Sequence, residues 1–209
     1  LANLIDVVVT SGDGRTRFQA TTTEDREKYQ AGMISTLLAG QAEALVMLWY
    51  QQAKPRVTAT SLVAALGEWH LMPPSSWPFL LRASERFAAG DWLSAGTLAV
   101  TNYEAALRGL LRAAGHSALK TSASGGMAHE TLNSLMESER VKQLLGKNHC
   151  RFVSHLLCDS QLGINLRNNV AHGLAREGDL SPGRILLVWL LLVRLTCYSV
   201  EQESEDEVG

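Results

Sequence analysis

The chain has 209 residues, of which 46% are hydrophobic and 19% are charged, and its formal net charge is -2. This length suits one sizeable domain, or a domain with a small appendage, and the apolar content predicts an ordered interior. A nearly neutral chain lacks the positive field of a general polyanion binder, although a local basic patch is compatible with RNA binding. Three cysteines cannot all pair, which favours a reducing, cytoplasmic compartment.

The first 20 residues contain the one clear β pattern. A valine run, a Ser-Gly-Asp-Gly turn and an alternating stretch predict a hairpin or an extended arm over 1–20. Because the sequence starts at Leu1 rather than Met, this arm is also interpreted as the remnant of a preceding region. From Thr21 the pattern is helical, with hydroxyl and then acidic residues at the start and Pro55 at the end. Further helices are expected at about 58–69 and 77–90, within an N-terminal helical region over 21–86.

Residues 87–199 predict a helical bundle. Asp91 is expected to cap a helix that closes at Gly115. The small and polar residues of 116–128 indicate a mobile loop. Helices are then expected at about 129–145, 148–158 and 183–199.

The last of these helices follows Ser181 and Pro182, a cap and a first-turn proline. Its apolar run, 185–193, is far shorter than the roughly 20 residues that span a bilayer. It therefore predicts a core helix, and we expect no membrane span in the chain. The acidic tail 200–209 is expected to be disordered. The fold class predicted from these patterns is all-α.

The candidate site is the stretch 163–174, "GINLRNNVAHGL". A helix turns about 100° per residue, so Asn168 and His172 share a face, and Arg167 lies about 140° from His172. A guanidinium offers a planar fork of donors to phosphate oxygens, and an imidazole passes protons near neutral pH. Together they suit the cleavage of RNA by its own 2′-hydroxyl.

The same stretch also reads as an ordinary helix end. About one Arg…His pair at such a spacing is expected by chance in a chain of this size. His172 beside Gly173 is typical of a helix C-terminus, where the macrodipole favours it, and asparagines hydrogen-bond locally. In that interpretation Arg167 and His172 point into solvent, far apart.

The wider sequence resembles the HEPN superfamily. The motif "LRNNVAHGL" is similar to the signature of that superfamily, an arginine followed by a polar residue and a histidine. The elements around it, "FAAGDWLSAGTLAVTNYEAALRGLLRAAG", "TLNSLMESERVKQLLG" and "FVSHLLCDSQLGINLRNNVAHGL" with a closing apolar helix, resemble one subgroup. This subgroup includes the endoplasmic-reticulum-membrane-associated RNA degradation protein and many uncharacterised bacterial proteins. The resemblance covers about residues 87–198.

The resemblance implies a helical bundle that dimerises and brings two motifs together across a two-fold cleft. Active members cut RNA without metal or cofactor and leave 2′,3′-cyclic phosphate ends. Carried over, Arg167 would hold the scissile phosphate, His172 would act as acid or base, and Asn168 would orient either of them. A toxin-like effector of stress or phage defence is one expectation. Other members are inactive, so a non-catalytic module that binds RNA, nucleotide or a partner protein is the alternative.

Two further sets of residues are considered. Glu104 and Arg108 are four apart on a helix, either as a surface pair or with Glu104 reaching the motif to position Arg167 or His172. Asn169 is assigned, with Glu104, to such a supporting role. A last set of histidines and cysteines lacks the Cys-x-x-Cys spacing of zinc sites and is interpreted as core, so no metal is expected. This set is His149, Cys150, His155 and Cys158.

Overall fold

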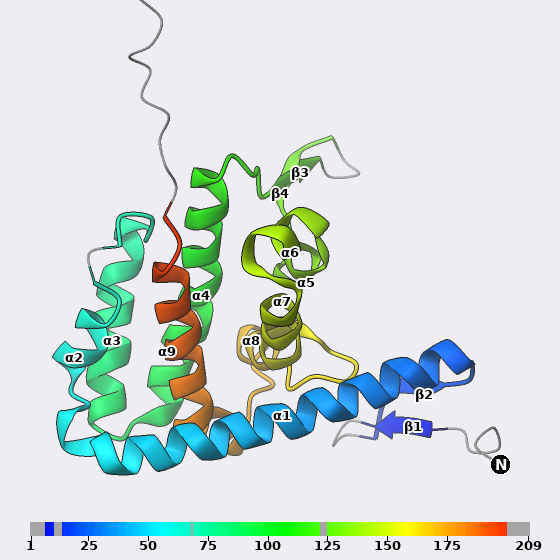
Figure 1. The fold of residues 1–209 in the computed structure, drawn as a ribbon, viewed down its shortest axis with the longest axis horizontal. Helices are drawn as coiled ribbons and strands as arrows, with labels where there is room; N and C mark the ends of the chain where they lie inside the picture. Colours follow the sequence, from blue (N-terminus) through cyan, green and yellow to red (C-terminus); the bar gives the residue numbers. More distant parts are fainter. Residues whose placement is uncertain (1–6, 11–13, 68, 122–124, 200–209) are drawn as a thin grey trace, which may run out of the picture.

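The computed structural model describes residues 7–10, 14–67, 69–121 and 125–199. They are mostly helical, as the sequence predicted, and the helices are arranged around one hydrophobic core (Figure 1). The helices are α1 (Thr23–Ala53), α2 (Ala59–Ala64), α3 (Trp77–Ala88), α4 (Trp92–Ala113), α5 (Leu132–Glu137), α6 (Glu139–Leu145), α7 (Lys147–Val153), α8 (Leu166–Ala171) and α9 (Pro182–Thr196). Shorter helical turns are the 3-10 turns Lys54–Arg56, Pro74–Ser76 and Glu177–Leu180 and the π-helical turn Ser154–Cys158. The tail 200–209, expected to be disordered, lies outside the described residues.

Two antiparallel hairpins accompany the helices. Strands β1 (Val7–Thr10) and β2 (Thr16–Ala20) pair with Val7 opposite Ala20, which confirms the predicted N-terminal hairpin. Strands β3 (Leu119–Thr121) and β4 (Met127–His129) form a second hairpin where a loop was predicted, so that prediction was wrong. Each of these strands has three residues, too few for an alternating pattern to stand out.

Local capping begins several helices where the sequence indicated. Thr22 accepts a hydrogen bond from the backbone N of Asp25, whose carboxylate accepts from the backbone N of Thr22, a complete capping box for α1. Asp91 caps α4 through Ser94, and Ser181 caps α9 with Pro182 in the first turn. These contacts span only three residues, which is why the sequence alone predicts them.

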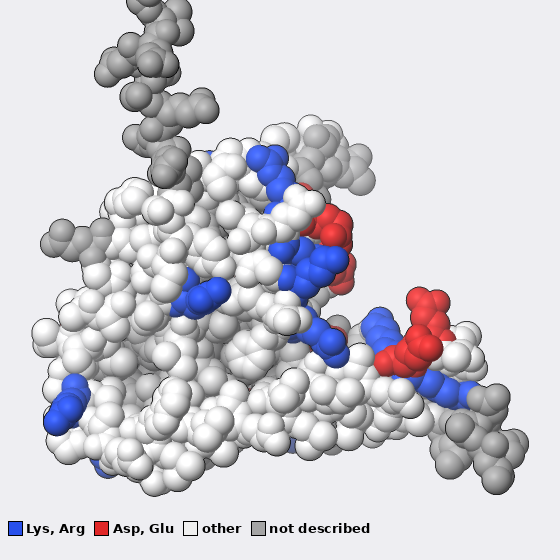
Figure 2. Space-filling view, in the orientation of Figure 1, with Lys and Arg blue, Asp and Glu red and all other residues white. Residues whose placement is uncertain are grey.

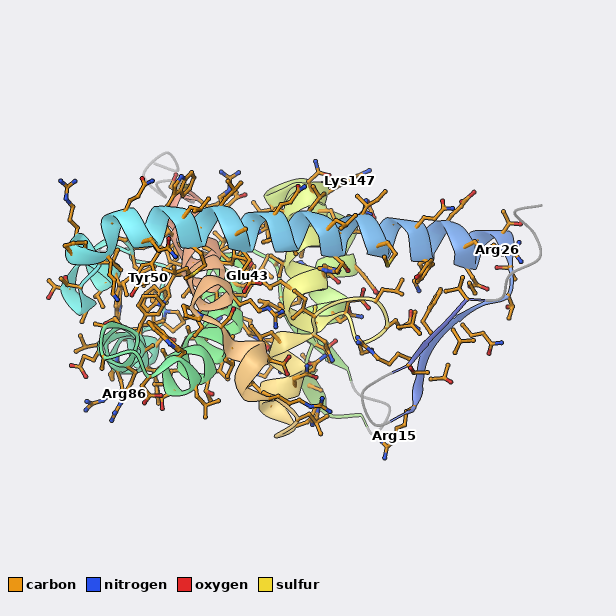
Figure 3. The ribbon with its side chains drawn as sticks, turned by 90° about the horizontal axis from the view of Figure 1, so that it is seen from below. Arg15, Arg26, Glu43, Tyr50, Arg86 and Lys147 are labelled. Carbon is orange, nitrogen blue, oxygen red and sulfur yellow. The ribbon has the colours of Figure 1, made fainter. Side chains whose placement is uncertain are left out.

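Helix α1 lies along one edge of the bundle and crosses the start of α9 (Figure 1). Figure 3 shows Glu43 and Tyr50 on the side of α1 that faces the other helices. Glu43 accepts hydrogen bonds from the Ser181 hydroxyl and from the Arg184 Nε, the latter at 3.2 Å. A Cβ at Gly183 would come within 2.6 Å of the Glu43 side chain, so a glycine is needed at this crossing.

The opposite side of α1 is apolar and exposed. Its large side chains are between 46 and 65% exposed: Met33, Ile34, Leu37, Leu38, Leu45, Leu48 and Trp49. In Figure 2 this surface is almost free of charge beyond the N-terminal end of the helix. By length and composition, α1 alone among the described helices is able to cross a membrane, and 11% of its most apolar window is buried. A single helix of this kind is weak support for a span.

The core forms where α4 packs against α3, α9 and the shorter helices. Leu107, Leu110, Val188 and Leu192 are fully buried, and the apolar run of α9 is a core segment, as predicted. Gly96 lets α4 lie close to Leu180, because a Cβ at position 96 would be 2.7 Å from a methyl group of that residue. The same core includes Val46, Leu66 and Leu80, so the helices of 21–86 pack into one interior with those of 87–199.

Candidate functional site

The candidate motif lies on α8, a short helix that follows a tightly folded loop. The carbonyl of His155, in the π-helical turn Ser154–Cys158, accepts a hydrogen bond from the Ile164 backbone N at 2.8 Å. Gly163 passes so close that a Cβ there would lie 2.4 Å from that carbonyl oxygen. Asn165 adopts the left-handed conformation, with φ of 60°, and α8 begins at the next residue, the fully buried Leu166. The π-helical turn thus fixes the start of α8, and such turns recur at functional sites.

Glu104 of α4 holds Arg167 of α8 in a partly buried ion pair. The Arg167 Nε donates to one carboxylate oxygen of Glu104 at 2.8 Å, and the Arg108 Nη2 donates to the other at 2.5 Å. The Glu104 side chain is 13% exposed, and those of Arg108 and Arg167 are 16% and 30% exposed. One carboxylate therefore neutralises only part of two guanidinium charges, and the three residues carry a net charge of +1.

Arg167 retains unused hydrogen-bond donors. Besides its Nε, it donates from Nη1 to the Asn168 Oδ1 at 3.0 Å. A guanidinium has five N–H groups, and among the described residues the other three of Arg167 have no partner. The side chain is held in place on one side and is open on the other, which is the arrangement that an anion-binding arginine needs.

The asparagines of the motif form a local network that supports this placement. The Asn168 Nδ2 donates to the Cys158 carbonyl at 3.2 Å and to the Asn165 Oδ1 at 2.8 Å. The Asn169 Nδ2 donates to the Ile164 carbonyl at 3.3 Å, and its Oδ1 accepts from Asn165 at 3.4 Å. Asn168 is therefore orientated by the loop before α8, and its carbonyl oxygen is directed at Arg167.

His172 stands apart from this network. It caps the C-terminus of α8, where its backbone N donates to the Asn168 carbonyl at 3.0 Å, and Gly173 follows with φ of 67°. Its side chain is exposed and, within the described residues, makes no hydrogen bond. The structure thus unites Arg167, Asn168 and Glu104, and it leaves His172 at the open end of the same helix. The helix-end interpretation fits the exposed His172. It does not fit Arg167, which is paired with Glu104.

The histidines and cysteines considered for zinc are mostly buried. Burial raises the pKa of the Cys158 thiol to about 12, so near neutral pH Cys158 is a thiol and its carbonyl is the group that contacts the motif. Burial also lowers the pKa of His155 and of His149. In the described part of the chain, no three His, Cys, Asp or Glu side chains are placed to hold one metal ion.

Sequence reasoning missed the second arginine of the site. Arg108 was considered only as a surface partner of Glu104, yet it is largely buried and also donates to the Glu130 carbonyl. The spacing of Glu104, Arg108 and Arg112, at every fourth residue of α4, is the signal that could have indicated a charged face. Asn165, one of the asparagines expected only to hydrogen-bond locally, forms the left-handed turn before α8.

No protein-family model, curated protein or solved structure matches the chain. Its function is therefore argued from the geometry of the site and from the resemblance of the motif.

Proposed function

We propose that the protein is a metal-independent endoribonuclease of the HEPN type. Arg167 would bind the scissile phosphate, and His172 would act as general acid or base. The observation that carries the proposal is the state of Arg167: its guanidinium is held by Glu104 and Asn168, and three N–H groups are left for an anion. The +1 charge of Glu104, Arg108 and Arg167 favours a phosphate at this point.

The reaction needs two proton transfers and one new bond. A base removes the proton of the RNA 2′-hydroxyl, and the resulting oxygen attacks the adjacent phosphorus. The bond from phosphorus to the 5′-oxygen breaks, and an acid protonates that oxygen as it leaves, so the products are a 2′,3′-cyclic phosphate and a 5′-hydroxyl. Arg167 would stabilise the charge that grows on the phosphoryl oxygens in the transition state. His172 is exposed, so its ring is accessible to a bound strand.

A homodimer is part of the proposal, because one chain contributes one motif histidine and the reaction uses an acid and a base. Two α8 helices facing each other across a two-fold axis would supply two copies of His172. Mixing wild-type subunits with His172→Ala subunits in equal amounts tests this arrangement. If the reaction needs His172 of both subunits, only the wild-type homodimers are active, and these are about a quarter of the dimers after random exchange. Activity of about a quarter of that of the same amount of wild-type protein is then expected, whereas about half would show that one His172 is enough.

The activity itself is tested by incubating the protein with labelled RNA in the presence of a chelator. We expect cleavage with cyclic phosphate ends, and we expect His172→Ala to abolish it while the fold is retained. His70→Ala is the matched control, since His70 is also exposed and lies outside the motif. Cleavage that stops with chelator, or that survives in His172→Ala, would contradict the proposal.

A non-catalytic module is the second candidate, and one observation favours it. His172 has no side-chain hydrogen bond to the Arg167 network among the described residues, whereas an acid or base is usually orientated by a neighbour. This candidate predicts that RNA, a nucleotide or a partner protein binds at Arg167 without any product. Binding that is lost in Arg167→Ala but unchanged in His172→Ala, with no cleavage by the wild type, would support it.

We place the protein in the cytoplasm, as a toxin-like effector of stress or phage defence. The free thiols of Cys150 and Cys158, both buried, are compatible with a reducing compartment. Growth arrest on expression, relieved by His172→Ala, is the outcome expected of such an effector.

A further inference from the structure

A basic pocket lies at the C-terminal end of α4. It has a volume of about 340 Å³ and is formed by the last turns of α4, the segment that follows and strand β4. Figure 1 shows the β3–β4 hairpin beside this end of α4. The side chains with nitrogen donors that line it are Arg108, Arg112, His116 and His129. None of the described lining residues is Asp or Glu. Arg108 is paired with Glu104 outside the pocket, whereas Arg112 brings a positive charge that no carboxylate of the wall offsets.

Two nitrogen atoms of these side chains are buried and have no partner. Among the described residues, neither the Nη1 of Arg108 nor the Nε2 of His116 makes a hydrogen bond. Both atoms are closed to solvent, so an anion in the pocket would not contact them directly. It would meet the exposed side chains of Arg112 and His129, and the nearby charge of Arg108 would favour its binding.

The pocket and the candidate site share Arg108. This residue lines the pocket, and its Nη2 donates to Glu104, the carboxylate that also holds Arg167. Arg112 is one turn further along the same face of α4. A row of cations therefore runs from Arg167 on α8, past Glu104, to the end of α4.

We propose that this pocket binds a second phosphate of the RNA strand whose scissile phosphodiester Arg167 holds. The inference rests on the proposed function, and it adds a substrate contact that lies outside the motif 163–174. Exposed Arg112 would supply its planar fork to the phosphate oxygens, and exposed His129 would supply a ring nitrogen. Contacts of this kind set the register of a strand without reading its bases.

The test measures binding apart from cleavage. The probe is a fluorescent single-stranded RNA with 2′-O-methyl groups, which removes the attacking hydroxyl, and its affinity is recorded at several salt concentrations. Each phosphate contact contributes about 0.7 to the slope of log K against log salt for a single strand. We expect Arg112→Gln combined with His129→Gln to lower that slope by about 0.7 and to weaken binding. Lys54→Gln, an exposed cation at the end of α1, is the charge-matched control and should leave the slope unchanged.

The outcomes separate this inference from the proposed function. An unchanged slope in the double variant, with wild-type cleavage of ordinary RNA, overturns the pocket assignment and leaves the nuclease intact. A lowered slope with no cleavage by the wild type supports the pocket and removes the nuclease. Adenosine monophosphate is a second probe. If the mononucleotide competes at the pocket while the double variant keeps the wild-type salt slope for RNA binding, the pocket binds a terminal phosphate. That result would overturn the RNA proposal. Thermal unfolding of each variant shows that the fold is retained.

Discussion

Arg167 donates its Nε–H to Glu104 at 2.8 Å, across 63 positions of the sequence. This contact joins α8 to α4 and holds the partly buried side chain of Arg167 against α4. Arg108 binds the other oxygen of the same carboxylate. The arginine that we propose to bind phosphate is thus preorganised by a residue from the central helix.

Removing the shared carboxylate should destabilise the protein. Glu104→Gln leaves two guanidiniums facing each other with no carboxylate between them, and we expect the free energy of unfolding to fall by about 2–4 kcal/mol. Urea denaturation measures this free energy of unfolding. The matched control is Glu85→Gln, whose partner Arg82 is 62% exposed, and it should change stability by less than about 1 kcal/mol. Equal effects of the two substitutions would show that Glu104 holds nothing in place.

Arg167→Lys keeps the charge of the motif but removes the planar fork. A lysine cannot bind Glu104 and Asn168 while also presenting two N–H groups to a phosphate. We expect RNA cleavage to fall by about 10²-fold, in line with the loss of a transition-state donor, and stability to fall much less. Single-turnover cleavage and thermal unfolding are the two measurements. A lysine variant with wild-type cleavage would show that a point charge is enough.

Gly163→Ala should disturb the loop that positions α8. Its Cβ would lie 2.4 Å from the His155 carbonyl oxygen and 2.8 Å from that of Asp159, both of them backbone atoms that cannot swing aside. We expect a loss of about 1–3 kcal/mol. In Gly40→Ala the new Cβ meets no atom within 4 Å, within a long helix, so stability should rise by about 0.5–1 kcal/mol. Chemical denaturation of both variants tests whether the free energy of unfolding falls in Gly163→Ala and rises in Gly40→Ala.

Stability should decrease as the pH falls below about 6.5, the ordinary pKa of histidine. Burial lowers the pKa of His155 in the folded protein, so between that pKa and 6.5 the unfolded chain binds more protons. The free energy of unfolding therefore drops through this window on acidification. In His155→Gln the drop should be smaller, whereas His70→Gln, at an exposed site, should retain the wild-type profile. Urea denaturation at a series of pH values measures it, and identical profiles in all three proteins would contradict the prediction.

The exposed face of α1 should contribute little to folding. Leu48 is 55% exposed, so Leu48→Ala should change the free energy of unfolding by no more than about 0.5 kcal/mol. The same substitution at Leu110, which is fully buried on α4, should cost about 2–5 kcal/mol. Thermal or chemical unfolding compares the two. A large loss in Leu48→Ala would mean that this face is covered when the protein folds.

Local signals determined much of the secondary structure. The capping box of Thr22 and Asp25, the Asp91 cap and the Ser181–Pro182 start each depend on residues within three positions, so the sequence predicted where these helices begin. The β3–β4 hairpin was missed because its ladder depends on pairing across a turn rather than on a pattern within either strand. The HEPN resemblance of 87–198 stays a prediction.

What the sequence by itself determined is the inventory of the site: Arg167, Asn168 and His172 on one short helix. Only the tertiary structure decided which of them meet. The ion pair with Glu104, the burial of Arg108 and the separation of His172 follow from how α8 lies against α4. Helical spacing orders side chains around one axis, and it carries no information on which distant helix will supply the partner. That choice is made by packing, where burial of apolar surface sets the position of each helix and charged groups pair within the space that remains.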